Sequence, residues 1–274
     1  MNKLRWNFKK LLLIKNKYIN YDYFFSQKLK NIRQKVNKSI TLNINHEKAV
    51  KDLNEQGYFL AKNVFDDDTI SHFCEEFDFV IGKYESTFDK NDISNSSQVR
   101  IFNQKDIIRD KLYACSALFS NSKLKKIIET QLEKKFIFNS EIFFQKSGHT
   151  KYPLAKDFHF DVLNSIKVWL YVDDCCVNSG PLEIVKKTHT KNKEIRDDSY
   201  IKKLKIDNVS KIQEFKNSLK LTAPKGSIII FNTDIFHRAT EIKKEFSRKV
   251  IRGHSFSEKS QIYNYELQST NSNH

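Results

Sequence analysis

The sequence predicts an α+β fold that is mainly β with flanking helices. Short runs rich in β-branched and aromatic residues, separated by turn signals, occupy the second half of the chain. These runs cover residues 141–145, 166–172, 182–185 and 226–231, with a turn at Asn178-Ser179-Gly180-Pro181. Short strands with such turns are typical of a double-stranded β-helix, the cupin-like jelly roll, whose mouth can hold a metal ion between strand ends.

Two amphipathic helices are expected in the first half. Apolar residues recur with helical spacing from Ile70 to Ile81, after the start signal Asp66-Asp67-Asp68, and again from Leu124 to Leu132. Both stripes indicate helices that pack against the sheet. Residues 191–219 form a polar insertion with little periodicity, which predicts either a cover over the mouth of the barrel or a solvated loop with one helix.

Length and composition allow one catalytic domain. The chain has 274 residues, of which 39% are hydrophobic, enough for a substantial core. We expect the domain at residues 46–260, followed by a polar tail at 261–274. The four cysteines contain no C-x-x-C pair, which favours a reduced, cytoplasmic setting.

Residues 1–45 are a basic N-terminal extension. They contain 11 Lys and Arg against a single acid, Asp22, and therefore carry +10 of the net charge of +15. Trp, Phe and Leu among these charges are typical of a segment that lies on an anionic membrane surface. This predicts peripheral contact with the inner face of the membrane; a basic extension that packs on the barrel or stays mobile is the alternative. No nucleic-acid motif accompanies the charge, so no nucleic-acid partner is expected.

Three residues form a candidate metal site. His159 and Asp161 are two positions apart, which places both side chains on the same face of an extended strand. His237 follows after a long gap, and Arg248 lies eleven positions further on. Two neutral imidazoles and one carboxylate hold non-haem Fe(II) on one face and leave positions open for O2 and a chelating co-substrate. The order H-x-D…H…R therefore predicts an oxygenase that uses Fe(II) and 2-oxoglutarate.

From about Ala49 to Phe256 the chain resembles the phytanoyl-CoA dioxygenase (PhyH) family of Fe(II)/2-oxoglutarate oxygenases. The matching residues are Gly57-Tyr58-Phe59-Leu60, Val64-Phe65-Asp66, His159-Phe160-Asp161, Trp169-Leu170, residues 178–182, Gly226-Ser227, His237 and Arg248. The family's Gly-Ser-His is Lys187-Thr188-His189 here, and Ala239 and Ile242 replace the small polar residue and the Asn that commonly follow the distal His. Substrate contacts from that loop therefore cannot be transferred.

The resemblance implies a role for each site residue. His159, Asp161 and His237 would bind iron, which the 2-oxo acid chelates through one carboxylate and its keto oxygen. Arg248 would bind the far carboxylate, since a planar guanidinium offers paired donors. Arg252, on the same face of the strand, is the alternative, or else a charge at the rim. Trp169 and Gln145 are further candidates for the co-substrate pocket, although Trp169 also suits plain core and Gln145 an outward-facing strand position.

The expected activity is hydroxylation of a small or lipid-linked metabolite, with release of succinate and CO2. The alternative is a non-catalytic jelly-roll binding or scaffold protein whose basic arm holds an anionic partner.

Overall fold

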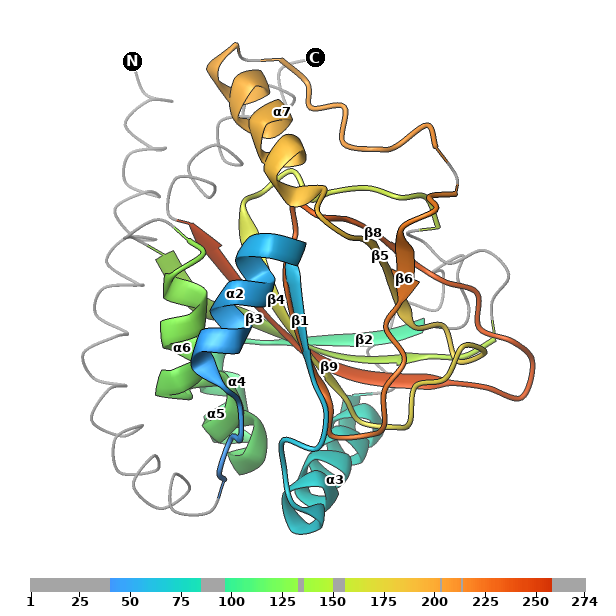
Figure 1. Ribbon diagram of the computed structural model, residues 1–274. Helices are drawn as coiled ribbons and strands as arrows, with labels where there is room; N and C mark the ends of the chain where they lie inside the picture. The colour runs from blue at the N-terminus through green and yellow to red at the C-terminus, as the bar shows by residue number, and fades with distance from the viewer. Residues whose placement is uncertain are drawn as a thin grey trace, which may run out of the picture. The chain divides into compact units, whose positions relative to one another are not determined.

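The fold places two antiparallel sheets face to face. The structure is a computed structural model that describes residues 40–84, 97–132, 136–149, 156–202, 204–212 and 214–257. The larger sheet has six strands in the order β1-β7-β4-β9-β3-β2, and the smaller has three in the order β6-β5-β8 (Figure 1). All strand pairs within them are antiparallel. The predicted α+β jelly roll is therefore confirmed.

The strands of the larger sheet are β1 (Tyr58–Ala61), β2 (Ser97–Phe102), β3 (Phe136–Ser147), β4 (Ser165–Tyr171), β7 (Ile228–Asn232) and β9 (Arg248–Ser257). The strands of the smaller sheet are β5 (Leu182–Val185), β6 (Ser218–Lys220) and β8 (Phe236–Ala239). The helices are α2 (His46–Gln56), α3 (Asp67–Tyr84), α4 (Gln104–Arg109), α5 (Tyr113–Phe119), α6 (Ser122–Glu129) and α7 (His189–Ile201). The two helices expected from periodicity correspond to α3 and α6.

Local capping sets where the first helix begins and ends. Asn45 Oδ1 accepts a hydrogen bond from Lys48 N at 2.9 Å and caps the start of α2. Gly57 ends the helix with φ at 85°, in the left-handed region that favours glycine. A Cβ at Gly57 would also lie 2.7 Å from His189 Nδ1. The glycine therefore allows both the turn into β1 and the close approach of α7.

The inner faces of the two sheets form the core. Trp169 and Tyr171 on β4 belong to one cluster with Leu182 and Ile184 on β5, and Val250 on β9 joins it. Since side chains alternate along a strand, Arg248, Arg252 and His254 face the same way as Val250. The inner face of β9 therefore brings charged groups into an otherwise apolar core.

The outer face of the larger sheet packs against helices. Phe144 on β3 contacts Phe77 of α3 and Phe102 of β2, with ring centroids 6.1 and 5.2 Å apart. The Glu76 carboxylate of α3 accepts hydrogen bonds from the backbone N–H groups of Ala114 and Cys115 at the start of α5. Because the central strands are buried on both faces, β4 and β7 are nearly continuous apolar runs.

The insertion at residues 191–219 contains a helix and a segment that pairs with the chain around His159. Its first part, up to Ile201, lies within α7. Further along, the backbone groups of Asn208 and Ser210 form hydrogen bonds with the backbone on either side of His159. Asn208 O accepts from Phe160 N at 3.0 Å, and Ser210 N donates to Phe158 O at 2.7 Å. The segment therefore flanks His159 directly. The basic extension up to residue 39 and the tail at 261–274 lie outside the described residues.

The His159-Phe160-Asp161 segment is less regular than the expected strand. His159 forms isolated bridges with Val209 and His237, but Phe160 and Asp161 belong to no strand. His159 N and O bond to His237 O and N at 3.0 and 2.8 Å, and Asp161 N bonds to Thr233 O at 2.9 Å. The prediction of a regular strand was wrong because pairing here is limited to single residues, yet these backbone bonds connect the segment to the chain around β8.

Candidate metal centre

The structure brings His159, Asp161 and His237 together. One potential ligand atom from each of the three lies within 4.8 Å of those of the other two. His237 Nε2 is 3.4 Å from Asp161 Oδ1, and the two imidazole centroids are 4.5 Å apart. Although 78 positions separate the two histidines in the sequence, the backbone bridge between them makes them neighbours. The donor set of two nitrogens and one oxygen suits a non-haem iron ion.

Both histidines present the same nitrogen to this group. His159 Nδ1 lies 2.9 Å from Asp157 O, and His237 Nδ1 lies 2.9 Å from Ile235 O. A carbonyl oxygen only accepts, so each Nδ1 carries the proton and donates it. In a neutral imidazole of this tautomer, Nε2 is the nitrogen whose lone pair can bind a metal. A backbone carbonyl that fixes the ring in this way is the usual support for a metal-binding histidine.

Asp161 divides its two oxygens between different partners. Oδ1 faces His237, whereas Oδ2 forms an ion pair with Lys167 Nζ at 2.6 Å. Burial by itself raises the pKa of the Asp161 carboxyl, but Lys167 and His237 outweigh it and hold that pKa well below its ordinary value. Asp161 is therefore a carboxylate near neutral pH, with one oxygen left to serve as a ligand.

Burial lowers the pKa of His159, and the neighbouring His237 lowers it further. His159 is accordingly a neutral imidazole near pH 7, which is the form that binds metals.

Arg248 lies at the first position of β9 and is only 5% exposed. Its Nη1 donates to Gly180 O, in the turn that the sequence marks at residues 178–181, and its guanidinium carbon lies 5.6 Å from the Trp169 ring centroid. Its Nε has no hydrogen-bond partner among the described residues. Burial lowers the pKa of Arg248. A buried guanidinium with unused donors is suited to a carboxylate ligand.

Arg252 lies directly opposite Trp169 on β4 and Phe143 on β3. Its guanidinium carbon is 4.6 Å from the Phe143 ring centroid and 5.7 Å from that of Trp169. Burial, and next the charge of Arg248, lower the pKa of Arg252 to about 10. Arg252 is half-buried, so it is part of the inner face of the sheet and not simply a charge at its rim.

The other two candidates lie on the same inner face. Trp169 is 5% exposed and belongs to the core cluster, and its ring stacks edge-on against Phe231 at 5.9 Å. Its indole N–H has no hydrogen-bond partner among the described residues. Gln145 is half-buried opposite Val250, and its Nε2 donates to Ser147 Oγ at 3.3 Å. The structure thus places Trp169 in the core beside both arginines and Gln145 on the neighbouring strand.

Sequence reasoning missed Lys167 and His254. The two residues are directly opposite each other on β4 and β9, on the inner face. Burial, and then the charges of Lys167 and Arg252, hold the pKa of His254 well below its ordinary value. The signal was present in the sequence: Lys167 has the same strand phase as Trp169 and Tyr171, inside an apolar run.

A buried ion pair connects α7 to the turn between β7 and β8. Arg196 Nη1 bonds to Asp234 Oδ1, and each of the two side chains is 1% exposed. Asn192 Nδ2 donates to Asp234 O at 2.8 Å. Asp234 lies in the β7–β8 turn, three residues before His237, so α7 holds the turn that leads into this histidine.

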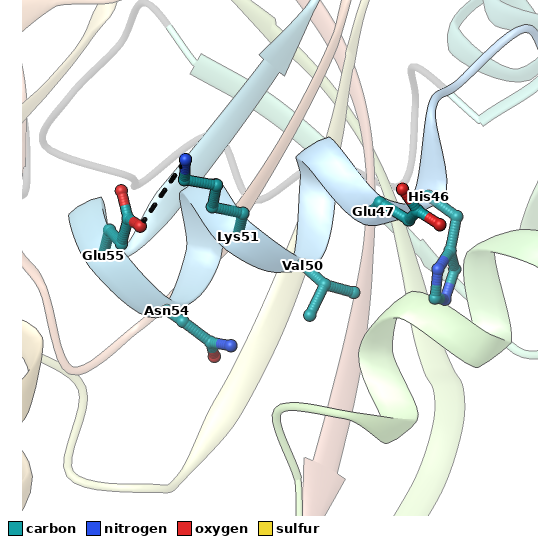
Figure 2. Close-up of a pocket in the computed structure, with 6 residues that line it drawn as sticks. All are labelled: His46, Glu47, Val50, Lys51, Asn54 and Glu55. Atoms are coloured by element: carbon teal, nitrogen blue, oxygen red, sulfur yellow. Dashed lines mark ion pairs between the residues drawn. The ribbon is translucent and has the colours of Figure 1, made fainter.

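A separate hollow of about 440 Å³ lies along α2 (Figure 2). Its lining residues are His46, Glu47, Val50, Lys51, Asn54 and Glu55. They all come from one helix, and Lys51 and Glu55 form an ion pair at 3.9 Å. The hollow shares no residue with the metal group, and a single helix face offers no convergent set of ligands.

Solved structures share this fold. One is the non-haem α-ketoglutarate-dependent epimerase SnoN from nogalamycin biosynthesis, at 10% identity over 77% of this chain and 82% of that chain, with a TM-score of 0.54. Another is EctD from S. alaskensis with 2-oxoglutarate and 5-hydroxyectoine, at 12% identity over 79% and 77%, with a TM-score of 0.55. A third is HygX from Streptomyces hygroscopicus with nickel and 2-oxoglutarate, at 10% identity over 77% and 86%, also with a TM-score of 0.55.

A search of the curated proteins found no match. The family comparison, in contrast, matches phytanoyl-CoA dioxygenase (PhyH) over residues 53–250, which is most of the chain and contains the metal group, Arg248 and Trp169. With the jelly roll and the His-Asp-His group both in place, the chain belongs to the phytanoyl-CoA dioxygenase family of Fe(II)/2-oxoglutarate-dependent oxygenases.

Proposed function

We propose that this chain is an Fe(II)- and 2-oxoglutarate-dependent dioxygenase that hydroxylates a small or lipid-linked metabolite and releases succinate and CO2. The observation that carries the proposal is the convergence of His159, Asp161 and His237, with both Nδ1 atoms bonded to backbone carbonyls. When bound there, iron would supply the activation of O2 that couples decarboxylation of the 2-oxo acid to oxidation of the substrate.

Each residue of the chain has a stated part. His159, Asp161 and His237 hold the metal on one face, and Lys167 keeps Asp161 charged and oriented. Arg248 binds the far carboxylate of 2-oxoglutarate, because its buried donors would otherwise stay partly unused. Trp169 packs beside that guanidinium and keeps water away from it. Gln145, on the next strand, supplies an amide for the co-substrate or the substrate.

Relatives with this fold support the choice of cofactors. Solved structures contain iron or 2-oxoglutarate in EctD, Fe3+ and α-ketoglutarate in SnoN, and nickel and 2-oxoglutarate in HygX. The substrates named for them belong to those proteins. For this chain, the family supports a small-molecule substrate.

The test is anaerobic binding of Fe(II) followed by addition of 2-oxoglutarate, which should produce the weak visible charge-transfer band of the chelate. Ala at His159, Asp161 or His237 should abolish the band. His72→Ala is the matched control, because His72 is an exposed histidine on α3. A wild-type band that survives all three ligand substitutions would disprove the assignment.

The non-catalytic alternative makes a different prediction. A jelly-roll binding or scaffold protein would bind no 2-oxoglutarate and form no succinate. Aerobic formation of succinate, even uncoupled from a substrate, therefore separates the two functions.

We also infer a cytoplasmic location, with the basic extension 1–45 in peripheral contact with anionic lipid at the inner face of the membrane. The charge of +10 in that segment supports the inference. None of the described helices combines the length and the apolar character needed to span a bilayer. The oxygenase domain is proposed to occupy residues 46–260, which include the matched range 53–250, followed by the polar tail 261–274.

A further inference from the structure

Arg252 is a second cation on the inner face of the larger sheet. It lies four residues along β9 from Arg248, and its guanidinium packs against the rings of Phe143 and Trp169. Arg248 is nearly inaccessible, whereas Arg252 keeps part of its surface exposed. The carboxylate of Asp161 in the metal group acts on the charge of Arg252, and the exposed part of Arg252 is available to a ligand.

No acid neutralises Arg252. No ion pair of Arg252 with a carboxylate is found among the described residues, and its buried Nε has no hydrogen-bond partner there. Asp161, the acid of the metal group, acts on the charge of Arg252, but it is already paired with Lys167. Glu141 on β3 also acts on Arg252 at a distance, but it is exposed. Even a half-buried guanidinium loses hydration, and without a counter-ion this cost is not offset, so an anionic ligand would stabilise it.

Iron and 2-oxoglutarate do not remove this excess of positive charge. The dication and the dianion cancel each other, and Lys167 cancels Asp161. Two positive charges, Arg248 and Arg252, then remain on the inner face. Binding of the far carboxylate at Arg248 does not change this net excess, so an additional anion is needed to balance Arg252.

We propose that Arg252 forms an anion subsite for the substrate that is oxidised, and that this substrate carries an oxyanion, either a carboxylate or a phosphate. The inference rests on the proposed function, because it assigns 2-oxoglutarate to Arg248. It narrows the substrate to an acidic metabolite whose charged group binds beside Phe143 and Trp169. The two rings supply an apolar contact next to the charge, which suits an organic acid with a carbon chain.

Trp169 makes the test direct. The chain has two tryptophans, Trp6 and Trp169, so a Trp6→Phe variant reports only on the ring beside Arg252. This protein is loaded with Zn(II), which is redox-silent, and with saturating 2-oxoglutarate, so that Arg248 is occupied. Butyrate and inorganic phosphate are then titrated while Trp169 fluorescence is recorded. Butyramide serves as the neutral match for butyrate, and the affinity for 2-oxoglutarate is measured calorimetrically on the same samples.

At least one of the two anions should change the fluorescence saturably, and butyramide should not. The stronger of the two identifies a carboxylate or a phosphate as the group recognised. Arg252→Gln should weaken anion binding by about ten-fold or more while the 2-oxoglutarate affinity stays within about three-fold. Arg252→Lys should restore part of the anion binding, and Lys146→Gln, which removes an exposed charge on β3, should have no effect.

Three results would overturn the proposal: equal responses to butyrate and butyramide, no response to either anion in protein that binds 2-oxoglutarate, or an Arg252→Gln variant that loses 2-oxoglutarate as strongly as the anion. The last result would assign Arg252 to the co-substrate. Wild-type protein that binds no 2-oxoglutarate would instead refute the proposed function, and the inference with it.

Discussion

Lys167 Nζ lies 2.6 Å from Asp161 Oδ2, while the other oxygen of the same carboxylate lies 3.4 Å from His237 Nε2. The lysine therefore contacts the carboxylate oxygen that is not paired with His237. Oδ1 is therefore the oxygen that Asp161 can offer to a metal ion. Bidentate coordination by Asp161 is disfavoured, because Lys167 occupies Oδ2.

The first prediction concerns this lysine. Lys167→Met should weaken Fe(II) binding by about ten- to a hundred-fold, the usual cost of losing a group that orients a ligand. Removing Lys167 also raises the pKa of Asp161, so protons compete with the metal at a higher pH. The loss should thus be larger at pH 6 than at pH 8 in anaerobic titrations. Lys146→Met is the control. If Lys167→Met binds Fe(II) as tightly as Lys146→Met does, Lys167 does not orient Asp161 for the metal.

The second prediction separates the two arginines of β9. Arg248→Ala should weaken 2-oxoglutarate binding by about 2–5 kcal/mol, since a charge-assisted pair in a buried position is lost. Arg252→Ala should have a much smaller effect, and both variants should still bind Fe(II). Calorimetry with Zn(II)-loaded protein measures the co-substrate affinity. A larger loss at Arg252 would transfer the role to that residue.

The third prediction concerns acid stability. Burial favours the neutral form of Asp110, but hydrogen bonds from Tyr84, Lys83 and Arg109 outweigh it and lower its pKa to about 2. A lowered pKa stabilises the fold above the unfolded value near 4, and this stability is lost as pH falls toward 2. Asp110→Asn should therefore cost about 2 kcal/mol at pH 7 and reduce the dependence of stability on pH between 4 and 2.

Urea unfolding at several pH values checks this prediction. Asp52→Asn is the control, because Asp52 forms an exposed pair with Lys48 on α2 and should contribute less than about 1 kcal/mol. Identical pH profiles for wild type and Asp110→Asn would contradict the assignment.

The fourth prediction concerns the Arg196–Asp234 pair. Asp234→Leu should destabilise the fold by at most about 3–5 kcal/mol, because Arg196 loses its buried counter-ion and keeps only the partly exposed Asp197, 3.1 Å away. The double variant Arg196→Met with Asp234→Leu should be more stable than Asp234→Leu alone. Urea unfolding of wild type, Asp234→Leu, Arg196→Met and the double variant gives the coupling energy between the two side chains. Strict additivity of the two substitutions would mean that the charges do not interact.

The fifth prediction concerns the basic extension. Full-length protein should sediment with anionic vesicles at low salt and dissociate as salt is added, because attraction between exposed charges decays over about 8 Å at physiological ionic strength. Removal of residues 1–40 should abolish sedimentation and leave 2-oxoglutarate turnover intact. A second variant with Gln at Lys9, Lys10, Lys15 and Lys17 tests the charge without shortening the chain. Equal vesicle binding before and after truncation would rule out the membrane role.

The sequence determined the features that depend on neighbouring residues. Strand alternation and helical periodicity located β4, β5, β7, α3 and α6, since burial of one or both faces leaves its period in the sequence. The spacing of His159, Asp161 and His237 predicted the candidate ligands that the fold brings together, and the motifs along the chain predicted the oxygenase family.

Only the tertiary structure decided which side chains meet. The register of β9 against β3 and β4 places Arg252 between Phe143 and Trp169, and the position of Asp161 against β4 gives it Lys167 as a partner. The pair between Arg196 and Asp234 joins a helix to a turn 38 positions away. Such contacts depend on how distant segments pair. The periodicity of each segment shows which of its faces is buried, but not which residue of another segment lies opposite.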